Sequence, residues 1–150
     1  MGEHIVKKGL DLPIAGAPDQ SDIHSGPAVS RVAIVAADYP GMKPTMLVQA
    51  GDTVKRGQAL FEDKKSPGKF FFMFGAGTVH SVNRGERRAL ISVVIELSAS
   101  ERSGQVADGE QTAFESYVSG EIGDLNRDQV RDLLIESGLR TALRSRPFSR

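Results

Sequence analysis

A glycine-punctuated run between Val48 and Leu60 limits the folds that are open to this chain. The run reads V-x-x-G-D-x-V-x-x-G-Q-x-L, with Gly51 and Gly57 six positions apart. Glycine accepts the positive φ that a sharp reversal of the chain requires, so each glycine marks a turn. Val54 and Leu60 are apolar positions beside these turns, and they predict core contacts. The run therefore predicts short strands joined by tight reversals.

The same spacing resembles that of the biotinyl/lipoyl-type domains, which are barrel-sandwich hybrids built from two interlocking β-hammerheads. A short echo supports the resemblance, because Val82–Gly85 repeats the valine and glycine positions of Val48–Gly51. We therefore expect a mainly β fold, a biotinyl/lipoyl-like barrel-sandwich hybrid, followed by a short helical segment. The fold alone assigns no function, because it is a swinging arm in some proteins and an inert module in others.

Runs of β-branched, aromatic and other apolar residues predict the strands, and turn-forming residues separate them. The first segment, Ile5–Ile14, is interpreted as a strand or extended arm, and a loop follows over Ala15–Pro27. The further predicted strands are Arg31–Ala37, Thr45–Val48, one that begins at Leu60–Phe61, Lys69–Phe74, Thr78–Val82 and Ala89–Leu97. The predicted turns are Tyr39–Met42, the hairpin tip Asp63–Gly68, and Asn83–Gly85.

Beyond these strands the chain becomes polar and then helical. Ser98–Gln111 is rich in Gly, Ser, Asp and Glu, which predicts a linker or long loop. Asn126–Ser137 is the best helix, because Asn126 is a favourable N-cap and Gln129 completes a variant capping box. Gly138 ends it. These boundaries divide the chain into a barrel-sandwich-hybrid-like β domain (residues 1–97), a linker (98–111) and a helical segment (112–150).

Composition excludes several classes of function. The 19 basic and 19 acidic residues cancel, which disfavours nucleic acid as a partner because phosphate binding needs a basic surplus. The chain has no cysteine, so disulfides, thiolate zinc sites and ligation of iron–sulfur clusters are excluded. No apolar run approaches the ~20 residues that span a bilayer, and residues 1–14 lack the apolar stretch of a secretory signal.

No group of side chains predicts catalysis or metal binding. His4, His24 and His80 are scattered, and no close set of carboxylates completes a metal site. Glu62 and Asp63 are adjacent, so a strand directs them to opposite faces and they cannot act as a paired acid and base. No phosphate-binding loop, nucleophile elbow or dinucleotide fingerprint is present. We predict no catalytic and no metal residues, and the sequence leaves any cofactor-binding residues unknown.

Two lysines in the predicted hairpin tip, Lys64 and Lys65, are candidates for attachment of a lipoyl or biotinyl group. In lipoyl domains the modified lysine lies further beyond the position of Leu60 than Lys64 does. The neighbouring Ser66-Pro67-Gly68 also departs from the usual surroundings of that lysine. A solvated basic tip is therefore favoured, and a carrier lysine is the alternative.

The aromatic run Phe70–Phe74 has apolar residues on both faces of its predicted strand. Alternation places Phe70, Phe72 and Phe74 on one face, and Phe71 and Met73 on the other. Such a strand is either buried on both faces in the core or buries one face against a partner. Core packing is the favoured interpretation, and a docking surface is the alternative.

The C-terminal tail is basic and includes a further expected helical turn over Leu139–Arg146. Its arginines are Arg140, Arg144, Arg146 and Arg150. A solvated helix face is the favoured interpretation of these side chains. The alternative is contact with anionic lipid, a phosphate or an acidic partner.

Five stretches, in order along nearly the whole chain, resemble one family. They are Lys7–Gly16 (KKGLDLPIAG), Gly41–Met46 (GMKPTM), Leu60–Gly68 (LFEDKKSPG), Asn83–Gly85 and Gly138–Ser149. Together they are similar to the NqrA family, which provides one subunit of the sodium-translocating NADH:quinone reductases. KKGLDLPIAG and FEDKK are the most distinctive of them.

The resemblance implies a role in a complex that passes electrons from NADH through flavins and iron–sulfur centres to ubiquinone and exports sodium ions. It implies that this chain binds no cofactor of its own and has a structural or docking role. Its partners would be the other subunits, with ubiquinone reached through the full-length NqrA protein. Its place would be peripheral, on the cytoplasmic side of the inner membrane.

The resemblance also bears on the extent of the chain. Family members are much longer, and a Rossmann-like domain follows the N-terminal domain. The helical segment would lead toward that domain, so the chain is expected to be a truncated gene product or a fragment. The alternatives are a lipoyl/biotinyl-like carrier module and the N-terminal domain of an Rnf-type electron-transport subunit.

Overall fold

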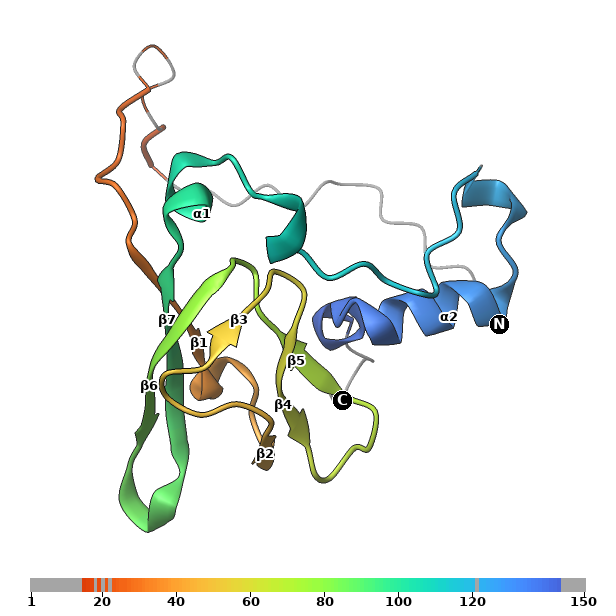
Figure 1. The fold of residues 1–150 in the computed structure, drawn as a ribbon, viewed down its shortest axis with the longest axis horizontal. Coiled ribbons are helices and arrows are strands. Elements are labelled where there is room, and N and C mark those ends of the chain that lie inside the picture. Colours follow the sequence, from red (N-terminus) through yellow and green to blue (C-terminus); the bar gives the residue numbers. More distant parts are fainter. Residues whose placement is uncertain (1–14, 18, 20, 22, 121, 144–150) are drawn as a thin grey trace.

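The computed structural model describes residues 15–17, 19, 21, 23–120 and 122–143. The predicted arm Ile5–Ile14 lies outside the described residues, as do His4, Arg144, Arg146 and Arg150. Two antiparallel sheets face each other and enclose the core (Figure 1). The mainly β character predicted for the first part of the chain is therefore confirmed.

The first sheet has the strand order β1-β7-β6-β3, and the second has the order β2-β4-β5. The strands are β1 (Arg31–Val35), β2 (Pro44–Met46), β3 (Thr53–Val54), β4 (Ala59–Asp63), β5 (Phe70–Phe72), β6 (Gly77–Arg84) and β7 (Leu90–Leu97). The helices are α1 (Ala99–Ser103) and α2 (Arg127–Glu136). Short 3-10 turns are η1 (Ala36–Asp38), η2 (Glu86–Arg88), η3 (Asp108–Glu110), η4 (Ile122–Asp124) and η5 (Leu139–Ala142).

The core lies where the glycine-punctuated run predicts it. Val54 and Leu60 are fully buried, and Gly51 and Gly57 have φ of 95° and 81°. Both sheets contribute, because every second side chain of a strand points inward. The most deeply buried side chains are Val54, Leu60, Phe61, Met73, Val79, Val93 and Ile95. Burial of this apolar surface stabilises the fold by about 25 cal/mol for each Å² removed from water.

Several strand boundaries differ from the sequence predictions. β1 ends at Val35, where η1 begins, and β5 is shorter than the predicted Lys69–Phe74. The predicted turn Asn83–Gly85 is wrong: Asn83 and Arg84 continue β6 and pair with Ser92 and Leu90 of β7. The reversal instead occupies Gly85–Ala89, where the Gly85 N–H donates to the Ala89 carbonyl. The long pairing with β7 outweighs the local turn preference of Asn and Gly.

The segment predicted as a linker or long loop, Ser98–Gln111, contains α1 and η3. Ser98 caps α1, since its hydroxyl accepts a hydrogen bond from the Glu101 N–H. The segment is also bound to the barrel, because Arg56 and Gln111 form a parallel β-bridge. Ser98 and Glu101 have the spacing of a capping box, which is a local sequence signal for a helix start. The polar composition of the segment predicted a loop instead.

The helix α2 confirms the capping prediction. The Asn126 side chain accepts hydrogen bonds from the Asp128 and Gln129 N–H groups, both at 3.0 Å. The Gln129 side chain accepts one from the Asn126 N–H at 2.9 Å. Gly138 follows the helix with φ of 74°, and η5 provides the further helical turn. Among the described helices, none is long and apolar enough to cross a membrane.

Candidate functional site

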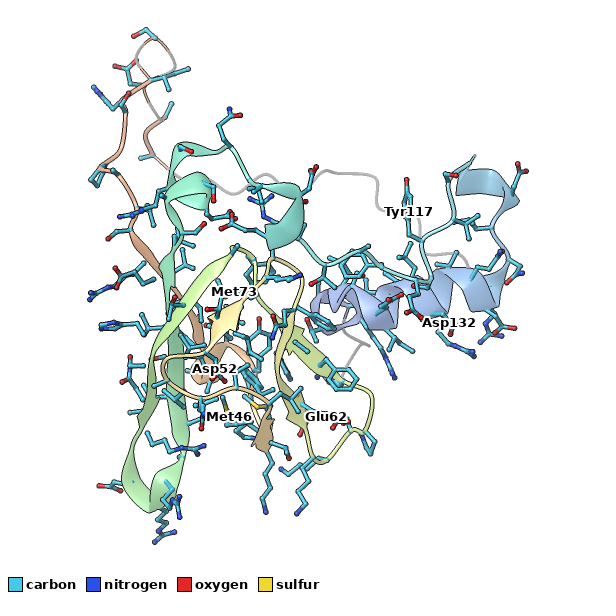
Figure 2. All side chains as sticks on the ribbon, viewed as in Figure 1. Met46, Asp52, Glu62, Met73, Tyr117 and Asp132 are labelled. Atoms are coloured by element: carbon cyan, nitrogen blue, oxygen red, sulfur yellow. The ribbon has the colours of Figure 1, made fainter. Side chains whose placement is uncertain are left out.

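The hairpin tip between β4 and β5 carries the lysines that a swinging-arm domain would modify. The tip is a compact turn: the Ser66 N–H donates to the Asp63 carbonyl at 2.9 Å, and the Lys69 N–H donates to the Ser66 carbonyl at 3.0 Å. Lys64 and Lys65 therefore lie in the tip, as expected from the sequence. Figure 2 shows the side chains of this region around Glu62.

The two adjacent carboxylates of the tip bind backbone groups. Asp63 is 5% exposed, and its Oδ1 accepts hydrogen bonds from the N–H groups of Lys43 and Lys65, both at 3.0 Å. Glu62 accepts one from the Gly68 N–H at 2.8 Å. A hydrogen bond to a charged acceptor is stronger than one between neutral groups. These contacts therefore hold the hairpin tip against the residues that precede β2. The FEDKK motif thus has a structural explanation.

The two lysines differ in their surroundings. The Lys65 ammonium donates to the Gly41 carbonyl at 2.8 Å, which ties it to the turn before β2. Both residues are exposed, but the hydrogen bond of Lys64 comes from its backbone N–H, which donates to the Lys43 carbonyl at 2.8 Å. A carrier group needs a lysine that moves freely with its cargo. Lys64 meets this requirement better than Lys65.

The histidines do not assemble a metal site in the part of the chain that the structure describes. His80 lies on β6, with Nδ1 3.7 Å from Glu96, which also accepts a hydrogen bond from Arg31 at 3.4 Å. His24 lies in the exposed segment before β1. No group of three or more His, Cys, Asp or Glu side chains in the described ranges has the arrangement for a metal ion.

The aromatic run has the alternation that the sequence predicts. Phe71 and Met73 are buried, and the Phe71 ring stacks on Phe61 with 4.7 Å between centroids. On the other face, Phe72 is half-buried and Phe74 is 74% exposed. Phe72 is covered by Gly138, where an added Cβ would lie 2.8 Å from the Phe72 Cε2. Core packing therefore explains one face, and the helical segment covers part of the other.

A basic groove, which the sequence analysis missed, lies between the η1–β2 segment and the β6–β7 hairpin. Its volume is about 670 Å³, and its cationic lining residues are Lys43, Arg84, Arg87 and Arg88. The available signal was the cluster N-R-G-E-R-R at positions 83–88. Of the tail arginines, for which a solvated face is predicted, only Arg140 lies in the described part of the chain, where it is exposed.

Comparisons with known proteins give one consistent result. Residues 5–98 match the family model of the NqrA N-terminal barrel-sandwich hybrid domain, which confirms the predicted fold class. The chain is similar to the NqrA subunits of the Na(+)-translocating NADH-quinone reductases of Yersinia pseudotuberculosis (53% identity), Serratia proteamaculans (54%) and Haemophilus influenzae (51%). Each alignment covers 97% of this chain and 30% of the relative. The chain therefore spans about 30% of the length of the curated relatives that it matches.

Proposed function

The chain belongs to the NqrA family, and on that premise we propose that it is a structural and docking part of the NqrA subunit in a sodium-translocating NADH:quinone reductase. The observation that carries the proposal is the 53% identity to such a protein over 97% of this chain. The family match also favours this assignment over the Rnf-type alternative. The partners proposed are the other subunits of such a complex.

The side-chain chemistry of the chain supports this structural role. The carboxylates of the β4–β5 tip are occupied by backbone N–H groups, so they serve the local structure. The chain has no cysteine to ligate an iron–sulfur cluster. We assign the NADH, flavin, iron–sulfur and ubiquinone chemistry of the complex to its other parts. The chain's proposed place is peripheral, on the cytoplasmic side of the inner membrane.

The test is assembly of the complex with and without this segment in the full-length NqrA protein. A tag on a different subunit should recover NqrA when residues 1–150 are present, and lose it when they are deleted. Quinone reductase activity should fall in proportion to the NqrA lost, because no reacting group has been removed. Full recovery of NqrA without the segment would contradict the docking role.

The exposed Lys64 at a hairpin tip favours a carrier module as the second candidate. Intact mass of the chain, purified from cells that lipoylate and biotinylate proteins, separates the two. The docking role predicts the unmodified mass of the sequence. A lipoyl or biotinyl addition that disappears in Lys64→Arg or Lys65→Arg would establish the carrier function instead.

A further inference from the structure

The basic groove between the η1–β2 segment and the β6–β7 hairpin combines an apolar floor with a cationic rim. Tyr39, Met42 and Leu90 line it with largely apolar surface. Four exposed cations line the same groove: Lys43, and three arginines of one hairpin, Arg84, Arg87 and Arg88. A volume of about 670 Å³ is within the range of sites that bind small molecules.

The backbone of the hairpin tip is held in an uncommon conformation at two consecutive arginines. Arg87 and Arg88 have φ of 53° and 62°, in the left-handed region that disfavours residues with a Cβ. The Arg84 guanidinium donates to the Arg88 carbonyl at 3.0 Å and braces this turn. Glycine would adopt this backbone conformation with less strain than arginine does. The two arginines at this tip therefore suggest a functional role for their side chains.

The charge around the groove is predominantly positive. Lys65 adds a further cation at the groove wall, because its ammonium binds the carbonyl of Gly41, itself a lining residue. The acidic residues near the groove are Glu86 in the hairpin tip, Asp38 in η1, and Asp63, which accepts a hydrogen bond from the Lys65 N–H. Five cations against three carboxylates leave a local surplus of two, in a chain whose total charge is zero.

Exposed apolar residues adjoin the cations. Ile91 is 51% exposed and Val35 is 38% exposed, and both line the groove. Figure 1 shows the β6–β7 hairpin tip projecting beyond the rest of the domain, at the end away from α1. A projecting tip that mixes cations with exposed aliphatic side chains is suited to the boundary between lipid headgroups and acyl chains.

We propose that this groove binds the phosphate of anionic phospholipids and seats this end of the domain on a membrane surface. Arginine suits this task because its planar guanidinium pairs with two phosphate oxygens at once. Ile91 and Val35 enter the headgroup region beside the bound phosphate, and the apolar floor accepts the first part of an acyl chain. The electrostatic attraction between these cations and an anionic surface adds to the membrane affinity that these contacts provide.

A membrane surface fits these observations better than an acidic protein partner does. Stable protein interfaces bury about 1,600 Å² in total, and a projecting hairpin tip offers little area to a rigid partner. A deformable lipid surface closes around such a tip. The inference shares with the proposed docking role only the location of the chain at a membrane. Vesicle binding is measured without the other subunits, so the two proposals are tested separately.

The experiment uses the 150-residue chain and vesicles of phosphatidylcholine with or without phosphatidylglycerol, at low salt, followed by co-sedimentation. We expect binding only to the vesicles that contain phosphatidylglycerol. The triple variant Lys43→Gln, Arg87→Gln, Arg88→Gln should bind about a hundredfold more weakly, because each cation near such a surface contributes about fivefold. The control variant Lys55→Gln, Arg102→Gln, Arg127→Gln removes the same charge from exposed positions outside the groove and should retain binding.

The outcomes distinguish lipid phosphate from inorganic phosphate, and a membrane surface from an acidic protein partner. Inorganic phosphate at the concentration of the lipid phosphate should leave vesicle binding unchanged, and displacement by it would overturn the membrane assignment. Equal loss of binding in both triple variants, or no binding by the unaltered chain, would also overturn it. Binding of a polyglutamate peptide without vesicle binding would assign the groove to an acidic partner. None of these results depends on recovery of NqrA with the complex.

Discussion

Arg56 and Glu101, 45 positions apart in the sequence, form a partly buried ion pair that binds α1 to the barrel. Glu101 also accepts a hydrogen bond from the Ala76 N–H at 3.0 Å, and its side chain is 8% exposed. The backbone of Arg56 contributes as well, because its N–H donates to the Glu110 carbonyl at 2.8 Å and its carbonyl accepts from the Thr112 N–H at 2.9 Å. One loop of the β unit thus holds the segment after β7.

Removing the Glu101 carboxylate should destabilise the chain through this connection. We expect Glu101→Ala to lower the free energy of unfolding by about 2–3 kcal/mol, because it leaves the Arg56 guanidinium and the Ala76 N–H without their acceptor. Urea denaturation followed by circular dichroism measures the change. Glu115→Gln, at an exposed residue, is the control and should change little. Equal stability of Glu101→Ala and the parent chain would contradict the structural role of the pair.

The same carboxylate makes stability depend on pH. Burial raises the pKa of Glu101, but the hydrogen bonds from Arg56 and Ala76 and the charge of Arg56 together hold it below its usual value of 4.5. A lowered folded-state pKa contributes stability above the unfolded value, and this is lost as the pH falls through the folded value. The stability difference between the parent chain and Glu101→Gln should therefore shrink as the pH falls below about 4.5. A difference that stays constant into acid would contradict the charge contribution.

Gly138 should not tolerate a larger residue. Gly138→Ala adds a methyl group against the Phe72 ring and requires positive φ from alanine, so we expect a loss of about 1–3 kcal/mol in unfolding free energy. Gly109→Ala is the matched control, because an added Cβ there meets nothing within 4 Å and its φ is not positive. Phe72→Leu should recover part of the loss in a double-mutant cycle. Equal effects of the two glycine variants would contradict the close approach.

Asp63 should matter more than Glu62 to the hairpin tip. Asp63→Ala leaves two backbone N–H groups without an acceptor at a buried position, with an expected cost of about 2–3 kcal/mol in unfolding free energy. Glu62→Ala removes a single hydrogen bond to Gly68, with an expected cost of about 1 kcal/mol. Thermal unfolding of both variants ranks them. The reverse order would show that the tip is held by other contacts.

The strained arginines predict opposite effects on stability and vesicle binding. Arg87→Gly should raise the free energy of unfolding by about 1 kcal/mol, since glycine adopts positive φ without steric cost. The same variant should weaken binding to anionic vesicles. Arg87→Ala removes the charge but keeps the Cβ, so it should weaken binding without the gain in stability. A gain in Arg87→Ala equal to that in Arg87→Gly would show that the backbone conformation carries no strain.

Local rules account for the parts of the structure that the sequence predicted well. Capping by Asn126 and Gln129 depends on neighbours within one turn, and the turns at Gly51 and Gly57 depend on glycine itself. The alternation of Phe71 and Met73 against Phe72 follows from strand geometry alone. The boundary error at Asn83 and Arg84 arose because pairing with β7 extends β6 past a sequence that locally favours a turn.

The sequence by itself therefore determined the mainly β class, the capped helix α2 and the buried positions Val54 and Leu60, because periodicity and local capping carry this information. Its motifs also determined the family. Only the tertiary structure decided that Arg56 reaches Glu101, that Gly138 lies on Phe72, and that Lys43 joins three arginines of a distant hairpin in one groove. These relationships join residues that are far apart in the chain. They depend on how the sheets, the loops and the helical segment pack together, which no local pattern specifies.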